Sequence, residues 1–174
     1  SYDRRGSNPT MSDDRRVNDG TPRISVVLPT YNSADVLPRA IDSALAQTID
    51  DIEVIVVDDA SDDSTKDVVR SYADSRVSLL SHDRNRGGAA ARNTGIQAAS
   101  GDYVAFLDSD DKWHPSKLQR QIDCLENRSD EWVASYTDYR TFDSENTRLL
   151  SRLLGLIPSR EKPLPTEGGA EGGA

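Results

Sequence analysis

The sequence predicts an α/β fold, a mostly parallel sheet with helices on both faces, and three observations support this prediction. Short runs rich in Ile and Val alternate with segments whose apolar residues recur at helical spacing. Residues 52–57 are nearly continuous in such β-branched residues, as in strands that are buried on both faces. Polar loops, two of them acidic, follow three of the strands, at the edge of the sheet where α/β proteins bind ligands.

The elements follow in a regular order after a polar N-terminal segment. Residues 1–22 cannot bury enough apolar surface to offset their ordering entropy, so we expect a disordered arm. The folded domain is expected over residues 23–146 and starts with a strand at 24–28, which Pro29 ends. Further strands are expected at 52–57, 77–81, 103–107 and 132–136, and helices at 37–45, 65–73, 89–99 and 115–127.

Local signals at the helix ends agree with this order. Ser33 or Asp35 is available to cap the first helix, and the loop at 58–64 is rich in residues that cap the second. Gly101 follows the third helix, as glycine often does. Pro115 stands where the first turn of the fourth helix is expected, a position that proline favours.

Composition excludes several classes of protein. The 174 residues suffice for one domain and hold 30 acidic against 21 basic side chains, a formal charge of −9. Because a nucleic-acid-binding domain should present a basic face, this balance argues against one. The single cysteine excludes an internal disulfide, and no apolar run is long enough to predict a membrane-spanning helix. We expect a cytoplasmic protein, because no basic-then-apolar signal segment opens the chain.

The kind of charge is also informative. Asp outnumbers Glu by 23 to 7, and Arg outnumbers Lys by 17 to 4. A salt-rich cytoplasm would tolerate such an Asp-heavy surface, because concentrated salt screens self-repulsion, so a halophilic source is one interpretation. A GC-rich genome that favours Arg codons, combined with local Asp clusters, explains the same counts.

The acidic loops suggest metal chemistry. Neighbouring carboxylates on a short loop repel one another unless a cation lies between them. Oxygen ligands select Mg²⁺ or Mn²⁺, and such ions usually keep several waters and bridge to substrate phosphates. Asp108 and Asp110 fit this use, since alternate residues of an extended loop point the same way. The alternative is that these aspartates only cap the next helix, as Asp111 could.

Four segments, in this order, carry a family resemblance: VLPTYN at 27–32, VVDDASDDS at 56–64, NRGGAAARNTG at 85–95 and FLDSDD at 106–111. Together they resemble the nucleotide-sugar-binding half of family 2 glycosyltransferases, which have the Rossmann-like GT-A fold. The resemblance covers residues 23–142. It implies transfer of a sugar from a nucleoside diphosphate sugar, with UDP as the default, to an acceptor hydroxyl. It also implies inversion at the sugar and a requirement for Mn²⁺ or Mg²⁺.

The resemblance also implies a role for each site residue. The first loop would lie along the base and ribose, and Asp59, with Asp58 beside it, would accept a hydrogen bond from a base N–H. Arg92 would lie near the base or the diphosphate, and Asn93 would shape the pocket. The implied donor-binding residues are Pro29, Thr30, Tyr31, Asn32, Asp58, Asp59, Arg92, Asn93, Asp108 and Ser109, and the implied metal ligands are Asp108, Asp110 and Asp111.

Three further side chains have open or structural interpretations. Trp113 either lines the sugar site or fills the core of its own loop. His114, next to Pro115, is expected to be a loop residue and not a ligand. Cys124 is expected to be a buried structural thiol within the fourth helix.

The chain departs from the family after residue 142. Inverting transfer needs a general base for the acceptor hydroxyl, and that base is unassigned here, with Asp138 and Asp143 as weak candidates. Residues 147–157 predict an apolar-faced helix that covers the sheet, lies on a membrane or pairs with a partner. Residues 158–174 predict a disordered tail. We therefore expect the C-terminal acceptor half to be truncated, replaced or supplied by a partner chain.

Other functions remain to be weighed. The chain could be a non-catalytic nucleotide-sugar-binding fragment or one subunit of a split transferase. A receiver domain is disfavoured because neither Lys66 nor Lys112 stands at a later strand end, and a dehydrogenase because no G-x-G-x-x-G follows the first strand. A lipid or polysaccharide acceptor is plausible, and a place at the inner face of the membrane, with peripheral contact, would suit the resemblance.

Overall fold

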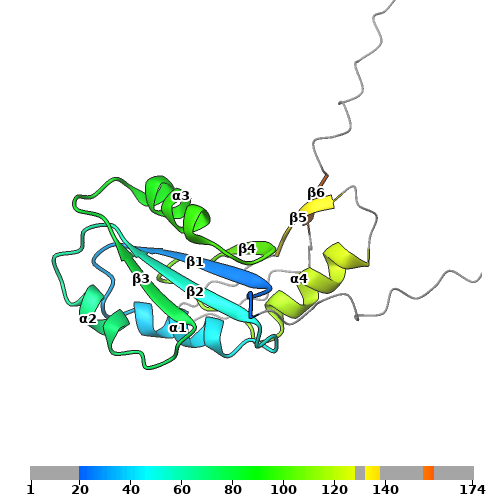
Figure 1. Cartoon of the computed structure of the whole chain (residues 1–174), viewed down its shortest axis with the longest axis horizontal. Coiled ribbons are helices and arrows are strands. Elements are labelled where there is room, and N and C mark those ends of the chain that lie inside the picture. Colours follow the sequence, from blue (N-terminus) through cyan, green and yellow to red (C-terminus); the bar gives the residue numbers. More distant parts are fainter. Residues whose placement is uncertain (1–19, 128–131, 138–154, 159–174) are drawn as a thin grey trace, which may run out of the picture.

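A computed structural model describes residues 20–127, 132–137 and 155–158. Its centre is a four-stranded parallel sheet in the order β3-β2-β1-β4 (Figure 1). The strands are β1 (Ile24–Thr30), β2 (Ile52–Asp58), β3 (Val77–Ser81) and β4 (Tyr103–Phe106). The helices are α1 (Leu37–Leu45), α2 (Thr65–Arg70), α3 (Gly88–Ala98) and α4 (Lys117–Glu126).

Helices cover both faces of this sheet, as predicted. Val54 and Val56 of β2 belong to the larger core cluster, to which α1, α2 and α4 contribute side chains. The alternate residues Ile55 and Val57 point to the other face and form a smaller cluster with Ala91 of α3. Figure 1 shows α3 on one side of the sheet and α1 on the other. Both faces of β2 are therefore buried, which explains its nearly continuous run of β-branched residues.

The approach of α3 to the sheet depends on one glycine. A Cβ added at Gly95 would lie 2.3 Å from a methyl carbon of Val27 in β1, which is much closer than van der Waals contact. Only a residue without a side chain lets the helix come so near the strand. This packing places the N-terminal end of α3 beside the carboxyl ends of β1 and β2.

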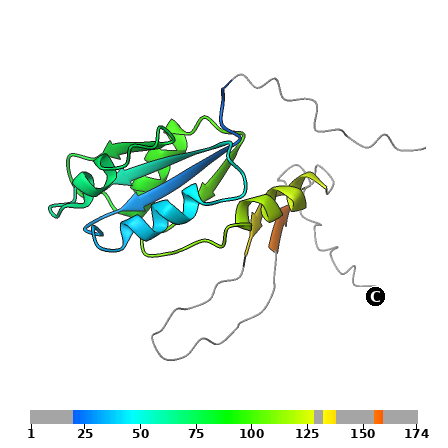
Figure 2. The same ribbon diagram turned by 90° about the horizontal axis from the view of Figure 1, so that it is seen from below.

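The C-terminal part corrects one prediction. Strand β5 (Trp132–Tyr136) forms as expected, but it pairs antiparallel with β6 (Gly155–Pro158) in a separate two-stranded sheet. The predicted helix at 147–157 is therefore wrong over 155–157, and its residues 147–154 lie outside the described residues. Glycine and proline are poor helix formers, and the ladder with β5 satisfies the backbone of this segment. Figures 1 and 2 both place the pair beside α4.

Several local predictions are settled by the described residues. Neither Ser33 nor Asp35 caps α1, because the N-cap position is Val36 and no side chain bonds there. Trp113 is buried in the core, and its ring lies under the Lys117 ammonium at 4.3 Å. The loop position of His114 is confirmed.

The prediction for Cys124 holds in part, since this thiol is half-buried in α4. Within residues 20–127, 132–137 and 155–158, no helix is long and apolar enough to cross a membrane. The predicted arm at 1–22, apart from residues 20–22, lies outside the described residues. So does the predicted tail at 158–174, apart from Pro158, which belongs to β6 instead.

Candidate active site

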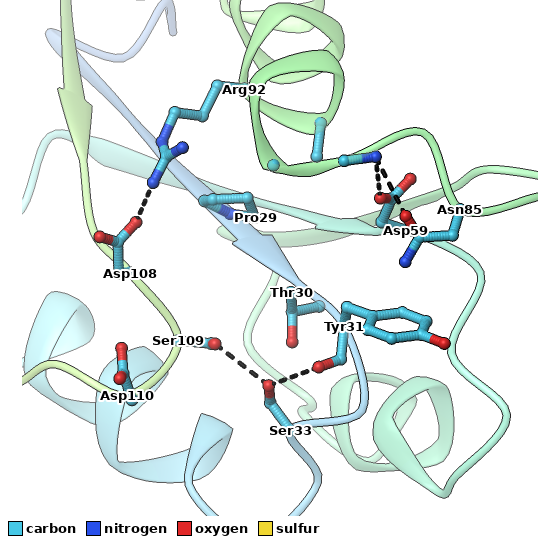
Figure 3. A pocket seen from close by; sticks show the side chains of 13 residues that line it. Pro29, Thr30, Tyr31, Ser33, Asp59, Asn85, Arg92, Asp108, Ser109 and Asp110 are labelled. Carbon is cyan, nitrogen blue, oxygen red and sulfur yellow. Dashed lines mark hydrogen bonds and ion pairs between the residues drawn. The ribbon is translucent and has the colours of Figure 1, made fainter.

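A cavity of about 330 Å³ opens at the carboxyl ends of the parallel strands. This is the edge at which α/β sheets bind ligands, because loops from neighbouring strands diverge there. Three loops and the N-terminal end of α3 supply its walls (Figure 3). The lining residues are Pro29, Thr30, Tyr31, Ser33, Asp59, Asn85, Gly87, Gly88, Ala91, Arg92, Asp108, Ser109 and Asp110.

The cavity brings together most of the predicted site residues. Eight of them line it: Pro29, Thr30, Tyr31, Asp59, Arg92, Asp108, Ser109 and Asp110. Four do not: Asn32, Asp58, Asn93 and Asp111. The candidate bases Asp138 and Asp143 lie outside the described residues. The site is thus assembled from the loops that the sequence indicated, but with fewer side chains than expected.

Asp59 forms one end of the cavity and is held by three N–H groups. His82 Nδ1 lies 2.6 Å from its Oδ1, the Arg86 N–H donates to both oxygens at 2.9 and 3.1 Å, and the Gly87 N–H donates at 2.7 Å. Burial raises the pKa of this carboxyl, but the hydrogen bonds outweigh burial and hold the pKa below its usual value. Asp59 is therefore an ionised acceptor that organises the turn before α3.

Asp58, its neighbour, has a different role. Its side chain is fully buried, accepts the Ser61 N–H at 3.3 and 3.2 Å, and lies 3.7 Å from Lys66 Nζ. Successive residues of a strand point to opposite faces, so only one of the two adjacent aspartates reaches the cavity. The predicted contact of Asp58 with the donor is thus not supported by its position.

Asn32 and Asn93 also lie away from the cavity. Asn32 adopts a left-handed backbone with φ of 48°, which asparagine tolerates better than most residues. Its Oδ1 accepts the Asp62 N–H at 3.0 Å and its N–H donates to Ser61 Oγ at 2.9 Å, which joins the first loop to the second. Asn93 is exposed on α3. Asn32 thus joins two loops that border the cavity and Asn93 faces solvent, and neither of them lines the cavity.

Hydroxyl groups line the middle of the cavity. Ser109 donates to Ser33 Oγ at 3.2 Å, and Ser33 in turn donates to the Tyr31 carbonyl at 2.9 Å. Thr30 Oγ1 is buried and has no hydrogen-bond partner among the described residues. Since buried hydroxyls nearly always have a partner, this oxygen is an indication that the site is completed by a ligand. The Tyr31 side chain stands at the mouth, 47% exposed.

The opposite end of the cavity is acidic and open. Asp108 pairs with Arg92 at 2.5 Å across the cavity (Figure 3), and Arg39 of α1 donates to the backbone carbonyl of Asp110. Asp111 is exposed and does not line the cavity. Burial, then the charges of Asp110 and Asp108, raise the pKa of Asp111, and Arg39 only partly opposes this. The loop therefore concentrates negative charge that the described side chains do not fully neutralise.

The donor set fits a hard divalent cation that is shared with a ligand. In the described part of the chain, no three His, Cys, Asp or Glu side chains are arranged to hold a metal by themselves. Two carboxylates that line one cavity are nevertheless sufficient for Mg²⁺ or Mn²⁺, because these ions commonly take their remaining ligands from phosphates and water. Asp108 and Asp110 line the cavity and could hold such an ion, whereas Asp111 does not line it.

His82 is the site residue that sequence reasoning missed. Its imidazole lies behind Asp59 and is buried, with Nε2 2.9 Å from Thr94 Oγ1 of α3. A local signal existed, because His82 directly follows β3 just as the two acidic loops directly follow β2 and β4.

Known proteins resemble this chain over most of its length. The Glycosyl transferase family 2 profile matches residues 25–170. The succinoglycan biosynthesis protein ExoO of Rhizobium meliloti (strain 1021) is 43% identical over 146 residues, which cover 83% of this chain and 42% of that protein. UDP-Glc:alpha-D-GlcNAc-diphosphoundecaprenol beta-1,3-glucosyltransferase WfaP of Escherichia coli is 38% identical over 116 residues, covering 67% and 45%.

A solved structure gives the same result for the fold. The mannosyltransferase PcManGT of Pyrobaculum calidifontis, in complex with GDP-Man and Mn²⁺, matches with a TM-score of 0.59 at 33% identity. The match covers 66% of this chain and 34% of that one. The chain thus spans less than half the length of each of these three proteins.

Proposed function

This chain belongs to glycosyltransferase family 2 and has the GT-A fold, and from that membership we propose the reaction in which it takes part. The proposed reaction transfers a sugar from a UDP-sugar to an acceptor hydroxyl, with inversion, in the presence of Mn²⁺ or Mg²⁺. The observation that carries the proposal is the single cavity in which Asp59, Arg92, Asp108 and Asp110 meet beside the unpartnered Thr30 hydroxyl.

The hydrogen bonds of Asp59 favour uracil as the base. A carboxylate has about four lone-pair sites, and the three N–H groups from His82, Arg86 and Gly87 occupy most of them. The remaining lone-pair site of the Asp59 carboxylate can accept one further hydrogen bond. Uracil offers a single N–H on its pairing edge, whereas guanine offers two adjacent donors that would compete for the same oxygen. We therefore propose that Asp59 accepts the N3–H of uracil, with the Tyr31 ring beside the base.

Arg92 and the acidic loop are proposed to hold the diphosphate. Asp108 and Asp110 would hold the divalent cation, which supplies electrostatic stabilisation of the departing diphosphate. Arg92 is 40% exposed and already lies within the cavity, where its guanidinium can turn from Asp108 to a phosphate oxygen. Ser109 and Thr30 offer hydroxyls to the ribose or the phosphates.

The acceptor side is proposed from the relatives alone. The name of WfaP gives a diphosphoundecaprenol-linked sugar as its acceptor, so we propose a lipid-linked or polysaccharide acceptor at the inner face of a membrane. The general base is proposed among residues outside the described part, with Asp138 and Asp143 as candidates. Because the chain spans less than half of its relatives, a second candidate function is donor binding without turnover, as a fragment or as one subunit of a split enzyme.

Calorimetric titration of the chain with UDP, with and without Mn²⁺, tests the proposal. We expect Mn²⁺-dependent binding of UDP and binding of GDP at least ~10-fold weaker, a difference of ~1.4 kcal/mol. The absence of any heat at millimolar UDP and Mn²⁺ would overturn both candidate functions. Incubation with UDP-glucose then separates them, because release of free glucose and UDP requires catalysis, whereas a binding fragment leaves the donor intact.

A further inference from the structure

The buried imidazole of His82 adjoins the proposed base-binding end of the cavity without lining it. It lies between Asp59, which follows β2, and Thr94, which lies in α3. We propose that His82 is a positioning residue that sets base selection by holding Asp59 in the orientation that accepts the uracil N3–H. This inference rests on the proposed function and adds to it the residue behind the carboxylate.

The contacts of His82 fix it at three points. Its backbone N–H donates to the Asp58 carbonyl at 2.9 Å, which extends the pairing of β3 with β2 by one residue. Its Nδ1 lies 2.6 Å from Asp59 Oδ1, and its Nε2 lies 2.9 Å from Thr94 Oγ1. The His82 and Asp59 side chains are only 6% and 4% exposed, so water competes little for these bonds. The ring therefore has little freedom to turn.

The ionised state of Asp59 fixes the direction of the hydrogen bond between His82 and Asp59. The ionised Asp59 carboxylate can only accept, so Nδ1 must carry the proton that it shares with Asp59. In the neutral imidazole Nε2 accepts from the Thr94 hydroxyl, and in the imidazolium it donates to the Thr94 oxygen. In both forms the ring links Thr94 to Asp59 at the cavity. The helix that carries Arg92 is in this way connected to the carboxylate proposed to select the base.

The surroundings of His82 argue against a role in filling space only. A second cavity, of about 510 Å³, is lined by Ser81, His82, Asp83, Arg84 and Arg86. An apolar side chain would suffice to close the gap between β3 and α3. The imidazole instead places one nitrogen on each of two polar partners, so the structure depends on its directional bonds.

Three variants separate the two ends of the imidazole. His82→Asn retains a side-chain N–H close to the position of Nδ1, and it loses the bond to Thr94. His82→Ala removes both bonds. Thr94→Val removes the hydroxyl at the far end while keeping the shape of the threonine side chain. If His82 positions Asp59, then His82→Ala should harm base selection most, and the other two variants should harm it less.

The decisive experiment measures Kd for UDP and for N3-methyl-UDP, which lacks the selected N–H, in the presence of Mn²⁺. We expect the wild-type chain to prefer UDP by ~10-fold, because a hydrogen bond to a charged acceptor is lost with the methylated ligand. His82→Ala should reduce this preference to less than about 2-fold, Thr94→Val should reduce it partly, and His82→Asn should retain most of it.

The outcomes distinguish this inference from the proposed function. A wild-type chain that binds neither ligand would overturn both. A wild-type chain that binds UDP without preference would overturn the inference together with the proposed contact between Asp59 and uracil, but not the proposed transfer reaction. A preference that survives in His82→Ala would overturn the inference alone. If His82 has a purely structural role, His82→Ala should lower the melting temperature and leave the preference for UDP unchanged. The reason is that a loss of stability does not change the ratio of the two Kd values. Should His82→Ala fail to fold, an unchanged preference in Thr94→Val would overturn the inference.

Discussion

Two aspartate-rich loops stand at equivalent places in the sheet, one after β2 at residues 58–63 and one after β4 at 108–111, and the protein treats them in opposite ways. In the first loop, backbone N–H groups take up the carboxylates: Asp58 accepts from Ser61, and Asp63 accepts from Ala34 and Thr65. In the second, the carboxylates of Asp108 and Asp110 line the open cavity.

The pKa values of the carboxyl groups are also shifted in opposite directions in the two loops. Hydrogen bonds, above all from the side chain of Thr65, hold the pKa of Asp63 below its usual value, and hydrogen bonds likewise lower the pKa of Asp59. Burial and the neighbouring carboxylates raise the pKa of Asp111. Two loops with similar aspartate-rich sequences therefore differ in what their carboxylates contact. Most carboxylates of the first loop accept N–H groups of the protein, whereas the second loop presents two carboxylates to the cavity, where we propose that a cation and a diphosphate bind.

The largest expected effect is the loss of stability when the hydrogen bonds of Asp59 in the first loop are removed. Asp59→Ala leaves three N–H donors without their acceptor, so we expect it to lower the free energy of unfolding by ~3 kcal/mol. Urea denaturation followed by circular dichroism measures this. Asp62→Ala is the matched control, because Asp62 is exposed in the same loop, and it should change stability by less than ~0.5 kcal/mol. Equal effects of the two variants would contradict the comparison.

The second loop should show the reverse behaviour. Asp110→Asn should leave the unfolding free energy within ~0.5 kcal/mol of wild type, because this side chain is exposed. It should also remove the enhancement of UDP binding by Mn²⁺, a loss of at least ~10-fold or ~1.4 kcal/mol. Calorimetric titrations with and without Mn²⁺ measure this loss, and Asp62→Asn serves as the control. Retained Mn²⁺ dependence would mean that Asp110 is not a metal ligand; the alternative that these aspartates cap the next helix is already wrong, because the N-cap of α4 is Ser116.

Arg92 joins the two ends of the cavity and gives an intermediate test. Its pair with Asp108 is exposed on both sides, so Arg92→Gln should cost less than ~1 kcal/mol of stability. The same change should weaken UDP binding by ~5-fold, or ~1 kcal/mol, because a cation near the diphosphate is removed. Arg92→Lys should lose less, since it keeps the charge. If Arg92→Gln destabilised the fold strongly and bound UDP normally, Arg92 would be structural.

The smallest effects should have opposite signs in the two loops. The pKa of Asp111 is raised in the folded state, so its ionised form opposes folding at pH 7. Asp111→Asn should therefore stabilise the unliganded chain slightly, by a few tenths of a kcal/mol given solvent screening. This gain should fade as the pH falls through the raised pKa of Asp111 and is lost below its unfolded value near 3.8.

Asp63 provides the matched variant for this pH test. Its pKa is lowered in the folded state, so it contributes stability above its unfolded value, which is lost as the pH falls through the lowered pKa. Asp63→Asn should thus destabilise the chain at pH 7, and the difference from wild type should shrink toward low pH. Unfolding curves at pH 7, 5 and 3 compare both variants. Effects of the same sign would show that the two loops do not differ in electrostatics.

Much of the fold followed from local patterns. The strand at 77–81 has the predicted bounds. Strands β1 and β2 are longer than their predicted ranges, 24–28 and 52–57, by two residues and one residue. These predictions succeed because a β-branched run and the polar residues that end it are local features of the sequence. The helix expected at 147–157 was wrong where it is described, at 155–157. An apolar segment beside Gly155 and Pro158 suits either state, and pairing with β5 decided it.

The sequence by itself determined the order of strands and helices as far as β5, and it identified the loops that line the cavity, since both depend on neighbouring residues. Only the tertiary structure decided which carboxylates are buried within the protein and which line the cavity. Asp58 and Asp59 are adjacent, yet one is buried beneath the loop and the other lines the cavity. The partners that hold Asp59 lie 23 to 28 positions along the chain, and no local pattern predicts hydrogen bonds over such separations.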